Sequence, residues 1–325
     1  MEFINCNLCG SDHPQTLFKV KDKFGVSQDE FHIVECRKCG LVYVNPRPTP
    51  DEIGKFYPET YSWKKTLKAE SLFTRWIRKL ENSYRSHLLK DEALKVVKLT
   101  GGHSGKVLDI GCGTGDRLEV FRKMGLEVFG VEISDSADYA KENLKLNVVK
   151  GDIFSAHFSD NFFNMITLYH VLEHTHNPTW VLEEIYRILE EGGFLIIQVP
   201  ISDCLQFKIF KERWTVFDVP RHLYYFRVTT LKTLLEKVGF KILKIDHFMN
   251  LWHPPTLVLS LFPTLDPQIA WQREVKGYTT VFQRIAWIFF TLLAIPFTQF
   301  ESWVGRGAIV TFYMVKPPLS LKNSP

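Results

Sequence analysis

The sequence predicts an α/β fold, with a doubly wound and mostly parallel sheet behind a small metal-binding unit. Three observations predict it. A glycine-rich turn, Gly111-x-Gly-x-Gly115, directly follows the short apolar segment 106–110. Segments typical of strands alternate with amphipathic segments typical of helices through residues 101–248, and two Cys-x-x-Cys pairs stand near the N-terminus. Because single cores stop growing near about 250–300 residues, a chain of 325 residues should hold more than one unit.

Composition excludes several classes of protein. Hydrophobic residues make up 45% of the chain and charged residues 23%, which is ordinary for a globular protein. The net charge of +4 is too small to indicate nucleic-acid binding by itself. No basic, apolar and small-residue series typical of a secretory signal opens the chain, so we expect a cytoplasmic protein.

The cysteine pairs come first along the chain. Cys6 and Cys9 are separated from Cys36 and Cys39 by 26 residues, and a glycine follows each pair. Four thiolates in this arrangement can close a tetrahedral structural Zn²⁺ site. Two disulfides are the alternative, but they need an oxidising compartment for which there is no targeting signal. We expect residues 1–45 to form a zinc-ribbon-like unit.

Residues 46–100 read as a linker followed by a basic helical segment. Three prolines in 41–50 predict an extended linker and a domain boundary. Residues 64–98 predict a helix with ten basic and four acidic residues, a net charge of +6. Its expected apolar face comprises Phe73, Trp76, Ile77, Leu80, Tyr84 and Leu88. The basic face either meets solvent on a helix packed over the core or contacts an anionic partner or membrane surface.

The glycine-rich turn joins a strand to a helix and is followed by further strands in a regular order. Glycine allows φ > 0 and a close approach of the backbone to a ligand, and a helix start offers unpaired N–H groups. A second strand, 128–131, ends in Glu132, where a carboxylate can accept both hydroxyls of a ribose. Val148 and Val149 lead to Gly151-Asp152-Ile153, and a fourth strand, 163–168, leads to Tyr169-His170.

This ordered set resembles the class I S-adenosylmethionine-dependent methyltransferases over roughly residues 106–248. The resemblance implies a seven-stranded Rossmann-like sheet and S-adenosyl-L-methionine as methyl donor. In that family the glycine turn lies under the methionine part, the acid of the second strand holds the ribose, and the acid after the third strand meets the adenine. The implied cofactor-binding residues are Asp109, Gly111, Gly113, Gly115, Glu132, Ile133, Asp152, Ile153 and Tyr169.

The remaining elements complete the sheet. We expect a helix capped by Ser134 and running to Leu144, a helix from Asn177-Pro178 to Gly192-Gly193, and a fifth strand over 194–199. A helix capped by Thr229 or Thr230 should end at Gly239, before a sixth strand over 241–247. Residues 308–315 supply the seventh strand, so 101–248 forms the methyltransferase core, 249–306 an insertion, and 307–325 the last strand and tail.

Two groups of residues could carry chemistry. His170, Glu173 and His174 sit at i, i+3 and i+4, a spacing that could bind a divalent metal. The stretch is similar to bacterial ubiquinone-pathway O-methyltransferases, which hold Glu, Glu and His at these positions, whereas this chain has His170 at the first. The alternative is that these residues line the cofactor pocket, with His170 as a catalytic candidate.

The second group lies in residues 214–226, a loop expected at the carboxyl ends of the strands. His222 could remove a proton from a substrate hydroxyl, or it could only fix the loop. The stretch resembles the Glu-His-x-x-Tyr-Phe segment of nucleotide-sugar C-methyltransferases, which share the four-cysteine unit. Arg221 replaces their glutamate, which favours transfer to oxygen or binding of an anionic group by Arg221. We take Arg221, Tyr225 and Trp214 as substrate-binding candidates.

The insertion 249–306 is strongly apolar, and residues 285–297 form a run of 13 without charge. A membrane-spanning helix needs about 20 apolar residues, so this run is too short to cross. A hydrophobic hairpin lying in one leaflet, with Trp287 and Phe290 among acyl chains, is one interpretation. The other is a cap buried on the protein or on a second subunit.

These observations together predict a methyltransferase that uses S-adenosylmethionine and methylates an oxygen of a glycan or lipid-linked small molecule. It would be cytoplasmic, either free or peripheral on the inner face of the cytoplasmic membrane. A nucleotide-sugar C-methyltransferase is the alternative enzyme. An RNA-binding protein with a methyltransferase fold is the alternative of another class, although the basic segment lacks the interleaved aromatic pattern of single-strand binders.

Overall fold

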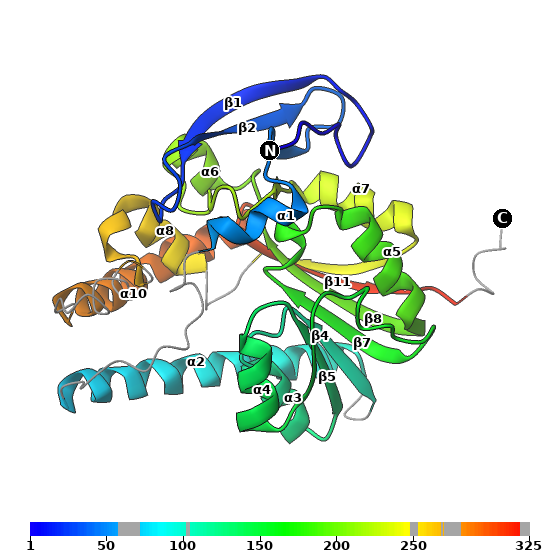
Figure 1. Ribbon diagram of the computed structural model, residues 1–325. Helices are drawn as coiled ribbons and strands as arrows, with labels where there is room; N and C mark the ends of the chain where they lie inside the picture. Colours follow the sequence, from blue (N-terminus) through cyan, green and yellow to red (C-terminus); the bar gives the residue numbers. More distant parts are fainter. Residues whose placement is uncertain (58–71, 102–104, 248–252, 268, 270–280, 319–325) are drawn as a thin grey trace.

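A computed structural model describes residues 1–57, 72–101, 105–247, 253–267, 269 and 281–318. These residues form two sheets (Figure 1). The larger has seven strands in the order β10-β11-β8-β7-β4-β5-β6, and the smaller has four strands in the order β1-β2-β3-β9.

The seven-stranded sheet confirms the predicted architecture. Its strands are β4 (Lys106–Ile110), β5 (Glu127–Glu132), β6 (Asn147–Lys150), β7 (Phe163–Tyr169), β8 (Leu189–Pro200), β10 (Lys241–Asp246) and β11 (Ile309–Val315). The strands β4 to β8 pair in parallel, while β11 runs antiparallel to both β8 and β10. The carboxyl ends of the parallel strands therefore meet at one edge, where ligands bind in folds of this kind.

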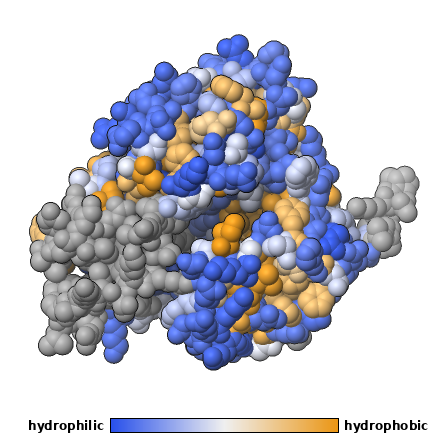
Figure 2. Space-filling model, viewed as in Figure 1, coloured by the Kyte–Doolittle hydropathy of each residue, from blue (hydrophilic) through white to orange (hydrophobic). Residues whose placement is uncertain are grey.

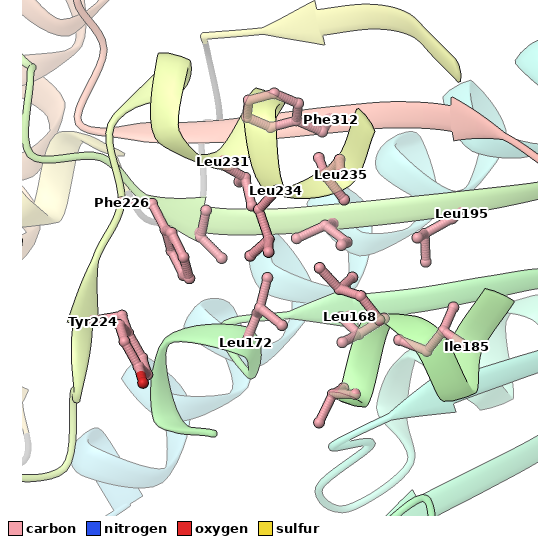
Figure 3. Packing of buried hydrophobic residues seen from close by; sticks show 14 of the residues in the cluster. Leu168, Leu172, Ile185, Leu195, Tyr224, Phe226, Leu231, Leu234, Leu235 and Phe312 are labelled. Carbon is pink, nitrogen blue, oxygen red and sulfur yellow. The ribbon is translucent and has the colours of Figure 1, made fainter. Parts of the chain in front are cut away.

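Helices cover both faces of this sheet. On one face, α2 (Leu72–Leu99), α3 (Asp116–Lys123) and α4 (Ser136–Leu144) pack against side chains such as Val107 and Val128. On the other, α5 (Pro178–Ile188) and α7 (Val228–Val238) pack against side chains such as Leu108 and Leu168 (Figure 3). Successive side chains of a strand point to opposite faces, so each inner strand supplies both cores.

Several predicted element boundaries shift. Helix α4 begins at Ser136 with Asp135 as its N-cap, and the hydroxyl of Ser134, two positions before the helix, accepts the N–H of Ser136. Helix α5 ends at Ile188, and the Gly192-Gly193 pair that was expected to stop it lies inside β8. The predicted N-cap of α5 is confirmed, since the Asn177 side chain accepts the N–H of Trp180.

Over the part of α2 whose side chains are described, the expected apolar face is confirmed only in part, because Leu88 is half-buried but the fully buried stripe lies elsewhere. Leu89, Ala93, Val96 and Val97 form its buried stripe, whereas Tyr84 is 51% exposed. The reason is that only the C-terminal part of α2 lies over the sheet, and its N-terminal part extends beyond it (Figure 1). Residues 64–71 and the side chains of Phe73, Trp76, Ile77 and Leu80 lie outside the described residues.

The N-terminal unit is joined to the core by a shared sheet. It consists of β1 (Pro14–Lys21), β2 (Glu30–Cys36) and β3 (Val42–Val44), followed by α1 (Pro50–Ile53) and η1 (Gly54–Phe56). The linker expected over 41–50 is therefore partly a strand. β3 pairs with β2 on one side and with β9 (Tyr224–Tyr225) on the other. All three of its side chains are buried, which suits a strand inside the sheet. The N-terminal unit thus shares backbone pairing with the loop that carries His222.

The described part of the insertion contains α8 (His253–Leu261), the short turn η4 (Pro263–Leu265) and α10 (Val281–Trp303). Leu257 and Val258 of α8 pack against Ala294 of α10. The buried carboxylate of Glu301, in the last turn of α10, accepts a hydrogen bond of 2.9 Å from Gln206 in α6 (Leu205–Phe210) and lies 3.0 Å from His253 Nε2. These contacts anchor the base of the helix pair to the core.

Candidate active site

The three glycines of the turn have different roles. A Cβ on Gly111 would lie 2.4 Å from Val171 Cγ2, and one on Gly115 would lie 2.4 Å from Leu146 Cδ1, so packing requires glycine at both positions. Gly113, at φ +55°, has no described atom within 4 Å of the place where its Cβ would be. The backbone at Gly113 is therefore open to a ligand.

Glu132 lies beside this turn at the end of β5. One oxygen accepts the N–H of Gly113 at 2.8 Å, and the other accepts the N–H of Ser134 at 2.7 Å. Each carboxylate oxygen has a further lone pair to offer, so two ribose hydroxyls can be bound while the backbone holds the carboxylate in place. Ile133, next along the chain, is 78% exposed at this edge. Glu132, Ile133 and the open turn fit the nucleoside part of S-adenosylmethionine.

Asp152 and Ile153 follow β6. Asp152 is exposed, and its Oδ1 accepts the N–H of Ser155 at 2.7 Å, which leaves carboxylate lone pairs available. Ile153 is 3% exposed and belongs to the core under α5 and α7. Its side chain therefore packs inside the protein, so its backbone is the part that can meet a cofactor.

Asp109 and Tyr169, both predicted from the sequence, lie beneath the turn among polar side chains that were not all predicted. Asp109 is buried and accepts a hydrogen bond of 2.6 Å from the Thr167 hydroxyl, and burial raises its pKa to about 6. Tyr169 packs under Arg117, whose guanidinium carbon is 3.2 Å from the ring centre. Arg117 donates to Glu92 of α2 at 2.8 Å.

Arg117 and Glu92 were not predicted as site residues. Arg117 is the second residue of α3, directly after the glycine turn, and this position was visible in the sequence. Glu92 comes from a helix distant in the chain and had no local signal. The pair ties α2 to the turn, so the basic helix also supports the cofactor edge.

A second cluster forms around Glu173, in the turn η2 (Leu172–His174) after β7. Glu173, His174 and His222 each bring a ligand atom within 4.8 Å of the others. His170, which has φ +57°, places its Nδ1 3.3 Å from Glu173 Oε1. The structure therefore brings His170 and His222, predicted from separate motifs, to the same carboxylate.

Figure 2 shows apolar surface in the hollow between the upper and lower parts of the face of the molecule seen in that view.

The charges in this cluster influence one another. Burial alone would raise the pKa of Glu173, but His170, His174 and His222 hold it below its usual value. Burial and the neighbouring His174 lower the pKa of His222 to about 3. His222 Nδ1 lies 2.9 Å from the carbonyl oxygen of Val216, so the ring is oriented by the backbone of its own loop.

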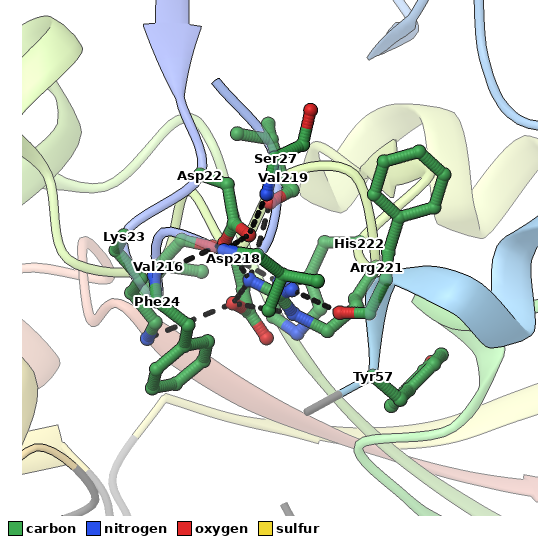
Figure 4. A network of polar contacts seen from close by, with 12 residues as sticks. Asp22, Lys23, Phe24, Ser27, Tyr57, Val216, Asp218, Val219, Arg221 and His222 are labelled. Carbon is green, nitrogen blue, oxygen red and sulfur yellow. Dashed lines mark hydrogen bonds and ion pairs between the residues drawn. The ribbon is translucent and has the colours of Figure 1, made fainter. Parts of the chain in front are cut away.

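The three predicted substrate-binding residues are buried, and this is a correction. Arg221 is 0%, Tyr225 0% and Trp214 1% exposed. Arg221 donates to Asp218, Asp22 and the carbonyl oxygens of Phe56 and Val219 (Figure 4). With its donors directed at protein acceptors, it stabilises the loop and does not meet a substrate anion. Trp214 and Tyr225 pack around Phe217 in the core between the small sheet and this loop.

The connection between β1 and β2 also reaches this loop, which the sequence did not suggest. Asp22 pairs with Arg221, and Lys23 Nζ lies 3.9 Å from Asp218 (Figure 4). Lys23 Nζ also lies 4.0 Å from Asp266 of the insertion. The N-terminal unit, the His222 loop and the insertion therefore meet at one place.

The four cysteines of the N-terminal unit lie together. Their sulfurs are all within 4.8 Å of one another, with Cys6 3.4 Å from Cys39 and Cys9 3.5 Å from Cys36. A tetrahedron with Zn–S bonds of about 2.3 Å needs sulfurs about 3.8 Å apart, so the set fits zinc. Burial raises the pKa of the Cys36 thiol, but N–H groups of Cys39 and Lys38 outweigh it and lower the pKa to about 7.

Comparison with known proteins identifies the family of this chain. A family model described as "Methyltransferase domain" matches residues 82–245. The demethylmenaquinone methyltransferase of Staphylococcus haemolyticus is 30% identical over 198 residues, covering 51% of this chain and 77% of that protein. A sterol 24-C-methyltransferase of Schizosaccharomyces pombe is 29% identical over 227 residues, covering 65% of this chain and 53% of the relative.

A solved structure shares the fold. Phosphoethanolamine N-methyltransferase 2 of Haemonchus contortus, in complex with S-adenosyl-L-methionine, aligns with a TM-score of 0.50 at 18% identity. The alignment covers 70% of this chain and 53% of that one. The family match, the seven-stranded sheet and the open glycine turn beside Glu132 lead to one conclusion. The chain belongs to the methyltransferase-domain family and is an S-adenosylmethionine-dependent methyltransferase.

Proposed function

We propose that this methyltransferase works at a membrane surface and methylates an oxygen of a glycan or lipid-linked acceptor. The observation that carries the proposal is the exposed apolar surface of α10. Residues Phe282–Trp303 are long and apolar enough to cross a membrane by length and composition, and only 17% of the apolar window is buried in the protein. The helix is thus longer than the 13-residue uncharged run suggested.

The exposed side chains of α10 define a face for lipid. Phe289 is 56%, Leu292 55% and Leu293 59% exposed, and further exposed members are Phe282, Ile285, Phe297, Phe300 and Trp303. Trp287 and Phe290, which were expected among acyl chains, instead pack against the apolar cluster where α8 and α10 meet. Because the last turn is anchored through Glu301, we propose that α10 lies in one leaflet with its base held by the protein.

The position of the insertion supports delivery of an acceptor from the membrane to the site. The hydroxyl of Ser260 in α8 accepts the N–H of Thr215 at 3.0 Å, in the loop that leads to His222. Arg85 of α2 and Arg306 after α10 are exposed basic residues, and α2 and α10 extend toward the same side in Figure 1. Anionic lipid would attract them. The relatives named for sterols and demethylmenaquinone have lipid substrates, which also supports a lipid-linked acceptor.

The chemistry asked of the protein is modest. S-adenosylmethionine supplies a methyl group on a sulfonium that leaves as a neutral thioether, so transfer needs a positioned acceptor oxygen and a place for its proton. Glu132 and the glycine turn would hold the donor. We expect His170 and His222, which both lie near Glu173, to be the catalytic residues: both orient the acceptor hydroxyl, and His170 takes part in its deprotonation.

We also propose that Cys6, Cys9, Cys36 and Cys39 hold a structural Zn²⁺ ion. The sulfur distances support it, and so do Gly10 and Gly40, whose φ angles of +71° and +76° let the chain turn around each pair. The zinc would stabilise the sheet β1-β2-β3-β9 and, through β9, the loop of His222.

Flotation with anionic liposomes tests the membrane proposal. The wild-type protein should float and should stay bound in high salt, because each large side chain buried in lipid contributes about 1.5–3 kcal/mol that salt does not screen. The double variant Phe289→Asp/Leu293→Asp should stay at the bottom of the gradient. A control with Tyr139→Asp and Leu243→Asp, which changes exposed apolar residues on α4 and β10, should float like wild type. If the wild type does not float, the insertion is a protein-facing cap and a soluble acceptor is favoured.

A further inference from the structure

Glu173, His174 and His222 come from two segments that lie 48 residues apart and converge beside the glycine turn. Glu173 and His174 belong to η2, and the backbone N–H of Leu223 donates to the carbonyl oxygen of Glu173 at 2.8 Å, which fixes the two segments together. The rings of His174 and His222 are 4.5 Å apart between centroids. The cluster is therefore held by backbone pairing and ring packing on both sides.

The hydrogen bonds of the two histidines determine which nitrogen remains available. His174 Nδ1 lies 2.9 Å from the carbonyl oxygen of Arg221, and His222 Nδ1 lies 2.9 Å from that of Val216. A carbonyl oxygen can only accept, so each Nδ1 carries a hydrogen. In a neutral ring Nε2 is then an acceptor. This arrangement, with Nδ1–H donated to a backbone carbonyl, is the usual support of a histidine that ligates metal through Nε2.

The third member is also an acceptor. Glu173 is 0% exposed, and among the described residues neither carboxylate oxygen has a hydrogen-bond partner. His170 Nδ1 is 3.3 Å from Oε1 as an ion-pair contact. Two ring nitrogens and a buried carboxylate that all accept would repel one another, and this repulsion is offset by a cation between them or by a proton on the neighbouring His170.

We propose that Glu173, His174 and His222 bind one divalent transition-metal ion, a site additional to the four cysteines. Two imidazole nitrogens and one carboxylate oxygen are the ligand set of zinc sites that keep a fourth position open. The proposed ligands come from both predicted motifs, Glu173 and His174 from the first and His222 from the second. They differ from the set of His170, Glu173 and His174 that the spacing suggested, because His170 contacts Glu173 as its ion-pair partner.

The metal would serve the reaction from the acceptor side. Val171, one residue before η2, packs against Gly111, so the cluster adjoins the cofactor turn. An acceptor oxygen in the open position would lose its proton more easily, because a bound metal ion lowers the pKa of an oxygen ligand. This role rests on the proposed function, whereas metal binding itself does not depend on the acceptor.

Metal analysis and cobalt substitution of the full-length protein test the site. Protein loaded with Zn²⁺ should hold two equivalents, of which Cys36→Ser removes one and Glu173→Gln or His222→Gln removes the other. With Co²⁺, the cysteine site gives intense thiolate-to-metal charge transfer in the near ultraviolet. The Glu173 site gives only weaker visible bands, which should be the bands that Glu173→Gln abolishes.

The control is His157→Asn, an exposed histidine at φ +48° where asparagine is well tolerated, and it should keep both equivalents. Retained binding of S-adenosylhomocysteine shows that each variant is folded. The inference is overturned if Cys36→Ser protein binds no metal, or if Glu173→Gln leaves the cobalt spectrum unchanged, in which case a protonated histidine balances Glu173. Failure of the liposome test with both metals present would instead remove only the membrane proposal.

Discussion

Replacing Arg221 by methionine should destabilise the whole fold. An exposed arginine that only bound substrate could be replaced without losing stability. The side chain is fully buried and donates to Asp218 from Nε at 3.0 Å and from Nη2 at 2.8 Å, and to the carbonyl oxygen of Phe56 at 2.6 Å. It also pairs with Asp22. Methionine fills a similar volume but leaves two buried carboxylates without their shared cation.

The magnitude follows from this burial. Removing one partner of a buried ion pair costs about 3–5 kcal/mol, because the other charge stays buried and uncompensated. The side chains of Asp22 and Asp218 are 0% and 7% exposed, so we expect a loss in this range or above it. Asp22→Asn leaves the Arg221–Asp218 pair intact and should cost less, about 1–3 kcal/mol.

The free energy of unfolding in urea, followed by tryptophan fluorescence, measures this loss. Arg227→Met is the matched control, because Arg227 pairs with Glu35 at 2.7 Å with both side chains about one-third exposed, and exposed pairs contribute about 0–1 kcal/mol. If Arg221→Met loses no more stability than Arg227→Met and only acceptor methylation falls, Arg221 is a substrate residue and the structural argument is wrong.

Three further predictions concern the cofactor, pH and zinc. Glu132→Gln should weaken S-adenosylhomocysteine binding by about 1.5–3 kcal/mol in calorimetry, because charged hydrogen bonds to the ribose and to the turn are lost. The control Glu127→Gln, at the exposed start of β5, should bind like wild type. Equal affinities of the two variants would contradict the role of Glu132. Burial raises the pKa of Asp109 from 3.8 to about 6, so the folded protein holds this proton more tightly than the unfolded chain. The resulting stabilisation is complete below about pH 4 and is lost as pH rises through 6, which lowers the free energy of unfolding by roughly 3 kcal/mol. Thermal unfolding of Asp109→Asn should lack this pH dependence, and a parallel profile would refute it. Cys36→Ser should lower the zinc content and increase proteolysis within residues 1–45 while S-adenosylhomocysteine still binds, and unchanged metal content would exclude a four-cysteine site.

The sequence by itself determined the parts of this protein that depend on local pattern. The Gly111-x-Gly-x-Gly115 turn, the strand ending in Glu132 and the alternation of strands and helices predicted the α/β sheet, and their resemblance to class I methyltransferases implied its seven strands and the methyl donor. These features are local because a strand period of two, a helix period of 3.6 and a positive φ are properties of short segments. The cysteine spacing likewise predicted the cluster of four sulfurs.

Only the tertiary structure decided which polar residues are buried in ion pairs and which lie in the candidate site. Arg221 and His222 are neighbours in one loop, yet pairing with Asp22, 199 positions away in the chain, buries Arg221, while His222 meets Glu173. The face of α10 that is left exposed was decided in the same way, by packing against α8. Burial and charge pairing depend on which distant segments meet, and no short window of sequence contains that information.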